Sequence, residues 1–178
     1  MTAYEQIWPV AEDHYGIITS ATAKAMGISK QSMAAMEKNG RLTRVGHGVY
    51  QVWHHVAGLN DVYAISVAIA GDGAYLRGAS VLWMLRLAPA NPDVMYVGTA
   101  KRVRRRFPKG FRLTNNAPCE TTEYDGYEGI RCQRLVDALR TAEDDGAVEP
   151  DRIAEAAQAA NEKGLITDEE CAQFQNKS

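Results

Sequence analysis

The sequence predicts an α+β protein, with a winged helix-turn-helix followed by a mixed α/β domain that has a small sheet and C-terminal helices. Two short helical patterns flank a turn at Gly27, and two short strand patterns flank Gly46-His47-Gly48. After residue 57, short strand patterns alternate with helical ones. A helix pair followed by a β-ribbon is the layout of a winged helix-turn-helix, whose second helix fits a DNA major groove.

We place the domain boundary near residues 53–58, where the pattern breaks. This gives a winged helix-turn-helix domain over residues 1–56 and a mixed α/β domain over residues 57–178, which ends in acidic helices over residues 150–175. His54 and His55 lie at the boundary. Adjacent histidines point in different directions on most backbones, and no cysteine or carboxylate cluster is nearby, so we interpret them as boundary residues and not as metal ligands.

The first domain is expected to begin with two helices. A first helix from Tyr4 to Tyr15 is predicted by apolar residues at helical spacing, namely Ile7, Trp8, Ala11 and Tyr15. A second helix is expected from Ser20 to Met26. Ala23 lies where the two helices of such a motif cross, and a larger side chain there would push them apart. Gly27 suits the left-handed backbone conformation that reverses the chain.

A third helix is expected to start after Ser29, whose side-chain oxygen suits an N-cap. Its inward face is predicted to carry three apolar residues, which are Ile28, Met33 and Met36. Asn39-Gly40 stops this helix, and a hairpin follows. The inward positions of the hairpin are predicted to be Leu42, Val45, Val49 and Val52.

The opposite face of the third helix carries small and polar side chains that can approach base edges and phosphates. The hairpin adds basic side chains on or near the wing. The DNA-contacting residues predicted in this domain are Ser29, Lys30, Gln31, Ala34, Lys38, Arg41, Arg44 and His47. The same patterns are compatible with a helical hairpin and ribbon that only pack against the rest of the chain, or with a winged helix that binds protein.

The second domain mixes helical and strand patterns. Helices are expected at Asp61–Ala70, Val81–Leu87, Gln133–Glu143, Pro150–Lys163 and Asp168–Gln175. Strands are expected at Ala74–Leu76, Val94–Val97, Phe111–Leu113 and, as a hairpin around Asp125-Gly126, at Thr121–Tyr124 and Tyr127–Cys132. Ser80 is expected to cap the helix that follows it, in preference to contacting a phosphate. The terminal helices are expected to cover the sheet edge.

Charge is unevenly distributed along the chain. Residues 57–113 carry nine Lys and Arg against three Asp and Glu, whereas residues 114–178 carry six against fifteen. Nucleic acid would be drawn to one face and repelled by the other. The densest positive cluster is predicted to be a second phosphate-contacting surface beside the winged helix, formed by Lys101, Arg102, Arg104, Arg105 and Arg106. A solvated loop after a strand is the alternative interpretation of this cluster.

The overall composition is that of a soluble globular protein, with 46% hydrophobic and 24% charged residues in a chain of 178. No apolar run approaches the roughly 20 residues that span a bilayer, so no membrane association is expected. The three cysteines, Cys119, Cys132 and Cys171, form no CxxC pattern. Reduced thiols in a cytoplasmic protein are the simplest interpretation.

We do not expect an enzyme, a cofactor or a metal. The sequence has no P-loop, no GxSxG elbow and no HExxH motif. Asp144-Asp145 is interpreted as part of a solvated loop. A nuclease that uses the winged helix for targeting is a third hypothesis, resting on the acidic residues Glu120, Glu123 and Asp125, of which only the last two are expected to share a strand face.

Several motifs occur in the order in which one known family has them. The N-terminal motifs are Ile17-Ile18-Thr19, Gly27-Ile28-Ser29, Gly40-Arg41-Leu42-Thr43-Arg44-Val45 and Gly48-Val49-Tyr50. The C-terminal motifs are Gly78 to Trp83, the strand Val94 to Val97 with the basic residues after it, and Gly129-Ile130 leading to Arg134-Leu135-Val136-Asp137. Over roughly residues 5–145 the chain resembles the AbiEi family of bacterial antitoxins. It departs from the family's Arg-Thr-Leu-x-Asp, because Leu135 directly follows Arg134.

The resemblance implies a DNA-binding antitoxin. Members of the family repress their own operon by binding repeats in double-stranded promoter DNA. They also counteract a nucleotidyltransferase-like toxin called AbiEii, in systems described as type IV because antitoxin and toxin need not form a stable complex. The second hypothesis is a winged-helix transcriptional regulator without a toxin, whose second domain binds a small effector or another protein.

Overall fold

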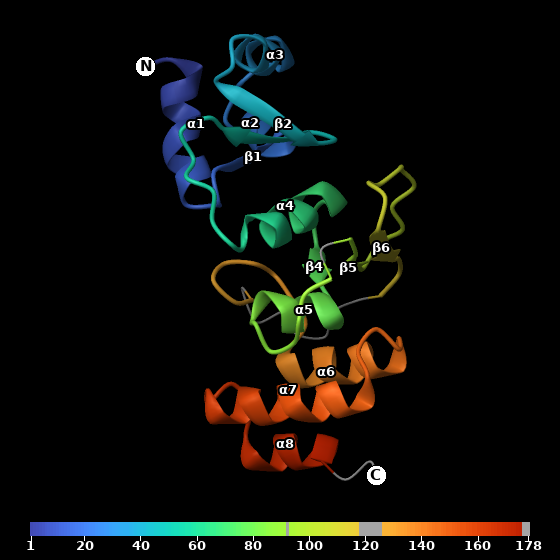
Figure 1. The fold of residues 1–178 in the computed structure, drawn as a ribbon. Helices are drawn as coiled ribbons and strands as arrows, with labels where there is room; N and C mark the ends of the chain where they lie inside the picture. The colour runs from blue at the N-terminus through green and yellow to red at the C-terminus, as the bar shows by residue number, and fades with distance from the viewer. Residues whose placement is uncertain (92, 118–125, 176–178) are drawn as a thin grey trace. The chain divides into compact units, whose positions relative to one another are not determined.

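The computed structural model describes residues 1–91, 93–117 and 126–175, and the chain divides into two compact units, Met1–Asp72 and Gly73–Ser178 (Figure 1). Helices and small sheets occur in both units, so the predicted α+β class is confirmed. The first unit includes the helix α4, Asp61–Ala70, which lies beyond the boundary predicted near residues 53–58. That boundary, as a limit between separately folding domains, stays a prediction.

The first unit is a winged helix-turn-helix with one helix added at its end. Its helices are α1 (Ala3–Glu12), α2 (Ser20–Ala25), α3 (Lys30–Lys38) and α4. Its strands are β1 (Ile17–Thr19), β2 (Leu42–Gly46) and β3 (Val49–Val52). They form an antiparallel sheet in the order β1-β3-β2, so the short strand before α2 pairs with the returning strand of the wing.

Local sequence features set the ends of these helices. Thr2 and Glu5 form a capping box at the start of α1, and Pro9 is accommodated inside that helix. The helix ends at Glu12, earlier than the predicted Tyr15, because Tyr15 and Gly16 both have positive φ. Gly27 has φ +78°, as the predicted turn between α2 and α3 requires.

One apolar core holds the first unit together. Residues from α1, β1, α2, α3 and the wing contribute to it, namely Ile7, Ala11, Ile18, Ala23, Ile28, Met33, Met36, Leu42 and Val52. The predicted inward residues of α3 and the wing are therefore buried, apart from Val45, which is half-buried. Ala23 is 1% exposed, so it is buried as a residue at a helix crossing is expected to be.

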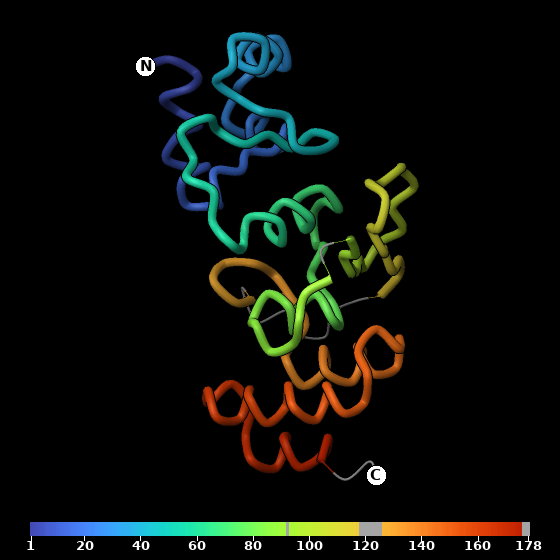
Figure 2. Tube along the Cα trace, in the orientation of Figure 1, coloured from blue at the N-terminus to red at the C-terminus, as the bar shows by residue number. Residues whose placement is uncertain are grey.

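In its described residues, the second unit contains a second small sheet and four helices. Its strands are β4 (Ala74–Leu76), β5 (Met95–Thr99) and β6 (Phe111–Thr114), and its helices are α5 (Ala79–Met84), α6 (Leu135–Asp144), α7 (Pro150–Glu162) and α8 (Asp168–Gln175). The strand order is β4-β5-β6, with β4 and β5 antiparallel and β5 and β6 parallel. Two parallel neighbours need a crossover between them, and here that crossover is the loop from residue 100 to residue 110, drawn in yellow in Figure 2.

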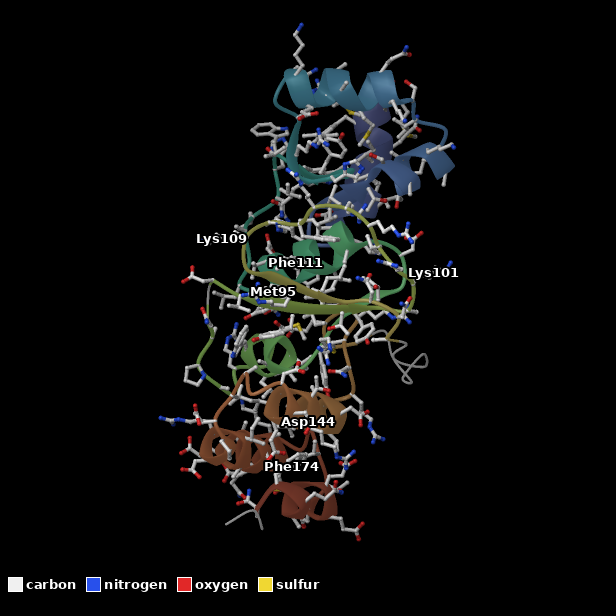
Figure 3. All side chains as sticks on the ribbon, turned by 90° about the vertical axis from the view of Figure 1, so that its right-hand side faces the viewer. Met95, Lys101, Lys109, Phe111, Asp144 and Phe174 are labelled. Atoms are coloured by element: carbon white, nitrogen blue, oxygen red, sulfur yellow. The ribbon has the colours of Figure 1, made fainter. Side chains whose placement is uncertain are left out.

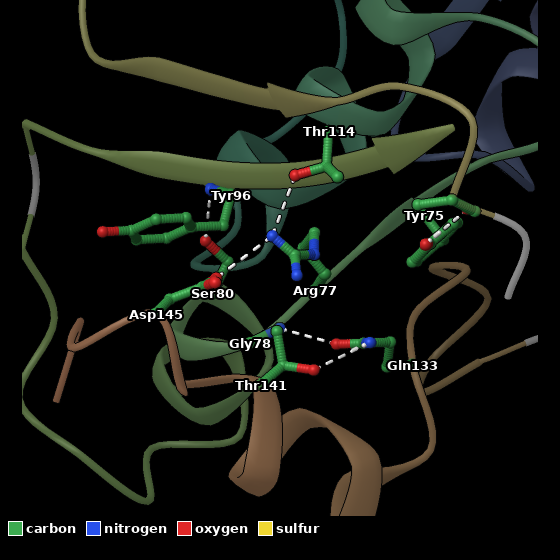
Figure 4. Close-up of polar contacts among 10 residues, drawn as sticks. Tyr75, Arg77, Gly78, Ser80, Tyr96, Thr114, Gln133, Thr141 and Asp145 are labelled. Atoms are coloured by element: carbon green, nitrogen blue, oxygen red, sulfur yellow. Dashed lines mark hydrogen bonds and ion pairs between the residues drawn. The ribbon is translucent and has the colours of Figure 1, made fainter. Parts of the chain in front are cut away.

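Ser80 does not have the role predicted for it. It lies inside α5 and is fully buried, and its Oγ accepts a hydrogen bond of 2.8 Å from the backbone N–H of Tyr96 on β5 (Figure 4). The prediction of a helix cap was therefore wrong. A buried hydroxyl needs a partner, and the sheet packed against α5 supplies it.

Other polar side chains connect the sheet to the segments around α6. Gln133 accepts a hydrogen bond from the N–H of Gly78 (2.7 Å) and donates one to Thr141 Oγ1 (3.1 Å) (Figure 4). Arg77 donates to Thr114 Oγ1 (2.8 Å) and to Asp145 (3.1 Å). Asp145 is thus paired with Arg77, which corrects the interpretation of Asp144-Asp145 as simply solvated.

The predicted hairpin around Asp125 is not confirmed in the part that the structure describes. Its first arm, Thr121–Tyr124, and the turn residue Asp125 lie outside the described residues, as do Cys119, Glu120 and Glu123. The second arm is not a continuous strand, since Tyr127 bridges Ile130 and Cys132 bridges Leu76. Cys132 and Cys171 are both buried, whereas the reduced state expected for the cysteines stays a prediction.

The last three helices pack on one another, α6 on α7 and α7 on α8. The buried face of α7 consists of Ile153, Ala156, Ala157 and Ala160, whose small side chains allow close helix contact. Thr167 and Glu170 form the reciprocal hydrogen bonds of a capping box at the start of α8. Within the described ranges, no helix combines the length and apolar character needed to cross a membrane.

Candidate nucleic-acid interface

One face of the helix α3 is packed against the core, and the helix is capped at its start. Met33 and Met36 are 4% and 6% exposed, and they hold the helix against the core together with Ile28. Ser29 is the N-cap, and its Oγ accepts a hydrogen bond of 3.1 Å from the N–H of Ser32. Burial on one side and a cap at the end give α3 a fixed position, as a helix that reads DNA requires.

The outward face of α3 is open to solvent. Lys30, Gln31, Ala34 and Lys38 are all exposed, as predicted. None of the four side chains has a hydrogen bond or ion pair with another described residue. Two ammonium groups, an amide and a methyl group are thus left available on one helical face, and these groups suit phosphates and base edges.

The wing carries its basic residues on a bulged hairpin. The register between β2 and β3 shifts between Arg44 and Gly46, and His47 lies exposed at the turn. Arg44 is exposed, and its Nε donates a hydrogen bond of 3.2 Å to the carbonyl of Gly46. A bulge of this kind bends the hairpin and redirects the side chains beside it.

Arg41 lies at the base of the wing and contacts α1. Its guanidinium carbon is 5.4 Å from the centre of the Tyr4 ring, within the range of a cation–π contact. Burial raises the pKa of the Tyr4 phenol above its ordinary value, and the positive charge of Arg41 lowers it in part. The predicted DNA contact of Arg41 therefore has to coexist with a packing role.

The predicted basic cluster lies in the second unit, on the loop between β5 and β6. Lys101 and Lys109 occupy the two ends of this loop (Figure 3). The predicted residues Lys101, Arg102, Arg104, Arg105 and Arg106 are all exposed, and so are Lys109 and Arg112. Among the residues that the structure describes, no carboxylate forms an ion pair with Lys101, Arg102, Arg104, Arg106, Lys109 or Arg112.

The backbone of this loop is anchored near its start. Asn115, just after β6, accepts a hydrogen bond of 2.7 Å from the N–H of Val103. Thr99, which is 2% exposed, donates a hydrogen bond of 2.6 Å to the carbonyl of Lys101. These two anchors hold the loop backbone on both sides of Arg102. The sequence gives no local sign of the Asn115 anchor, because Asn115 follows β6 and lies twelve residues from Val103.

Aromatic rings fix the other end of the loop. Phe107 stacks on Phe111 of β6, with ring centres 4.8 Å apart and planes 12° apart. Arg105 lies over the Phe107 ring, its guanidinium carbon 5.5 Å from the ring centre. The loop is thus a shaped segment that presents cations, which favours a binding surface over the solvated loop of the alternative interpretation.

The thirteen predicted DNA-contacting residues fall into two sets, eight in the first unit and five in the second. Within each set all the residues are exposed. Their contact with DNA is untested by the structure and stays a prediction.

The described residues contain no group of three or more His, Cys, Asp and Glu side chains that could hold a metal ion. His55 instead forms a 2.7 Å contact with Asp61 at the start of α4. This pair was not predicted from the sequence, because Asp61 was expected in a separate domain. The acidic residues of the nuclease hypothesis lie outside the described residues.

Residues 5–52 match the model of a family described as a transcriptional regulator, AbiEi antitoxin. The match spans most of the winged helix-turn-helix. This confirms the family resemblance for the motifs from Ile17 to Tyr50, whereas the resemblance beyond residue 52 stays a prediction. No curated protein matches the chain.

The AbiEi match covers the segment that contains α3 and the wing, together with most of α1, which packs in the same core. It does not include α4 or the basic loop. The family description names a transcriptional regulator, and this agrees with a winged helix whose outward face is polar and free of internal partners.

Proposed function

We propose that this protein is the DNA-binding antitoxin of a type IV, AbiE-like toxin–antitoxin system. It binds repeats in its own promoter, represses its operon and counteracts a nucleotidyltransferase-like toxin. The observation that carries the DNA-binding part is the unpartnered face of α3 on a buried, capped helix inside the AbiEi match. The toxin-directed part rests on the family resemblance.

In the proposed complex, α3 lies in the major groove and the wing contacts the adjacent backbone. Gln31 has the donor and acceptor groups that can read an adenine edge, and Lys30 and Arg44 contact phosphates. The basic loop of the second unit adds phosphate contacts. The phosphate contacts supply affinity, and the few contacts to base edges supply specificity.

The test of DNA binding is a gel shift with the protein's own upstream region at fixed salt. We expect a shift with the wild-type chain and its loss when Lys30, Gln31 and Arg44 are replaced by alanine together. Replacing Lys163, which is exposed on the C-terminal side of α7, by alanine is the matched surface control. An equal shift with the triple variant would refute the assigned surface.

The neighbouring genes separate the antitoxin from a regulator without a toxin. We expect an adjacent reading frame for a nucleotidyltransferase-like protein, whose expression slows growth unless this chain is also expressed. If growth stays slow when this chain is also expressed, the antitoxin function is refuted, and a transcriptional regulator without a toxin is the function that remains.

A further inference from the structure

The helix α4 packs on all three strands of the winged sheet, although it lies outside the winged motif in sequence. In Figure 1 an extended segment, residues 53–60, connects the wing to α4. Asp61 at its first turn is 8% exposed, and one carboxylate oxygen accepts a hydrogen bond from Gln51 (3.1 Å) and contacts His55 (2.7 Å). These contacts tie the start of α4 to β3 and to the connecting segment.

The other end of α4 lies against the wing. Ile69 is 7% exposed and packs on Gly46, the last residue of β2. A Cβ atom on Gly46 would lie 2.4 Å from Cγ1 and 2.7 Å from Cδ1 of Ile69. The isoleucine side chain thus occupies the space that any larger residue at position 46 would need.

Gly46 is also the residue that orients Arg44. The register shift of the wing lies between these two residues, and the Gly46 carbonyl accepts the hydrogen bond from Arg44 Nε. A displacement of Gly46 therefore moves the acceptor that holds the guanidinium. Ile69 is thus connected to Arg44 through Gly46, which packs on the isoleucine and accepts the hydrogen bond from the arginine.

We propose that Ile69 is a positioning residue for the DNA contact of Arg44, which makes α4 part of the DNA-binding apparatus. This inference rests on the proposed function. By supporting the bulge, Ile69 holds the guanidinium in one orientation before DNA arrives, so less rotamer freedom is lost on binding. Ordering one long side chain typically changes affinity by about three- to tenfold.

The first test measures DNA dissociation constants for Ile69→Ala in two backgrounds. We expect Ile69→Ala to weaken binding by about three- to tenfold in the wild-type chain. In an Arg44→Ala background it should have no further effect, because the side chain that Ile69 positions is already gone. Equal weakening in both backgrounds would mean a general structural role and would overturn the inference.

The second test uses the close contact directly. Gly46 does not have a positive φ, so Gly46→Ala strains the wing mainly through the contact with Ile69. We expect Gly46→Ala to weaken DNA binding and Gly46→Ala/Ile69→Ala to bind better than Gly46→Ala, because both clashing atoms are absent. The remaining Cβ of residue 69 would be at 3.6 Å, an ordinary contact. Double-variant binding no better than that of Gly46→Ala would contradict the inference.

Ile65→Ala is the matched control, since it removes the same atoms from a half-buried position of α4. It should leave the dissociation constant unchanged. Thermal unfolding of every variant checks that it is folded at the assay temperature, and Ile69→Val, which removes only the terminal methyl, replaces Ile69→Ala if that variant is unfolded. Failure of the wild-type chain to bind would refute the proposed function, whereas binding without dependence on Arg44 would refute only this inference.

Discussion

At the residue scale, Ser29 combines a local structural task with a place at the predicted interface. Its Oγ caps α3 through the N–H of Ser32, and its side chain is exposed. The two roles require different properties of the side chain. A helix cap requires only a hydrogen-bond acceptor, whereas a contact with phosphate requires that the side chain carries no negative charge.

Substitutions of Ser29 should therefore separate stability from binding. We expect Ser29→Ala to lower the free energy of unfolding by about 1 kcal/mol, because the cap is removed. Ser29→Asp should keep most of that free energy, yet raise the dissociation constant for DNA by repelling phosphate. Denaturant unfolding and gel shifts measure the two effects, and tight DNA binding by Ser29→Asp would place this residue away from the backbone of the duplex.

Tyr4 gives a pH dependence with a defined sign. Burial raises the pKa of its phenol, and Arg41 partly opposes this, so the folded chain holds the proton more tightly than the unfolded chain. The resulting stabilisation is complete below the unfolded pKa of about 10 and is lost as the pH rises through the folded value. We expect the melting temperature of the wild type to fall more steeply above about pH 10 than that of Tyr4→Phe. Parallel curves for the two proteins would contradict this.

At the scale of elements, the basic loop joins two parallel strands without a helix. Its start is anchored by Asn115 and Thr99, and its end by the ring stack of Phe107 and Phe111. Loss of the loop's charges and loss of its anchors should affect DNA binding in different ways. The charges set the number of counterions released, and the anchors set how much order the loop must gain on binding.

Charge reversal at Arg104, Arg105 and Arg106 should weaken DNA binding and flatten its salt dependence. The slope of log K against log salt should shrink by about 0.9 for each phosphate that the loop no longer neutralises. Asn115→Ala should weaken DNA binding but leave the slope of log K against log salt unchanged, because the loop keeps all its charges and loses only the hydrogen bond that holds its backbone.

The control for the loop anchor is Asn116→Gly. Asn116 is exposed and has φ +54°, a conformation that glycine adopts without strain. This variant should bind DNA like the wild type. Titrations at several salt concentrations measure the dissociation constants and their salt dependence. Unchanged binding after charge reversal would mean that the basic cluster is a solvated loop without DNA contacts.

At the scale of the whole molecule, the two predicted surfaces belong to different compact units. Changes at sites without shared partners usually add in free energy, within about 0.5 kcal/mol. We therefore combine Arg44→Ala with charge reversal of the loop. On the same promoter fragment, the loss of binding free energy in the combined variant should equal the sum of the losses in the two separate variants. A combined effect no larger than that of Arg44→Ala alone would show that the loop contributes nothing to DNA binding.

The sequence predicted the features whose causes are local. Gly27 marks a turn because only a few residues adopt its backbone conformation easily, and Ser29 marks a helix start because its oxygen meets an N–H three residues away. The burial of Met33 and Met36 follows from helical periodicity. These signals lie within a few residues of one another, so they were readable before folding.

The tertiary structure decided the features that depend on distant partners. Ser80 resembled a cap but is buried against Tyr96, Asp61 was expected in a separate domain but binds Gln51 and His55, and Asn115 gave no signal until β6 brought it to the loop. The support of Gly46 by Ile69 belongs to the same class. By itself the sequence determined a winged helix with a polar outward face and a cluster of cations. Which side chains hold those groups in place was decided by contacts that form only when separate elements pack together, because no periodicity or spacing along the chain records them.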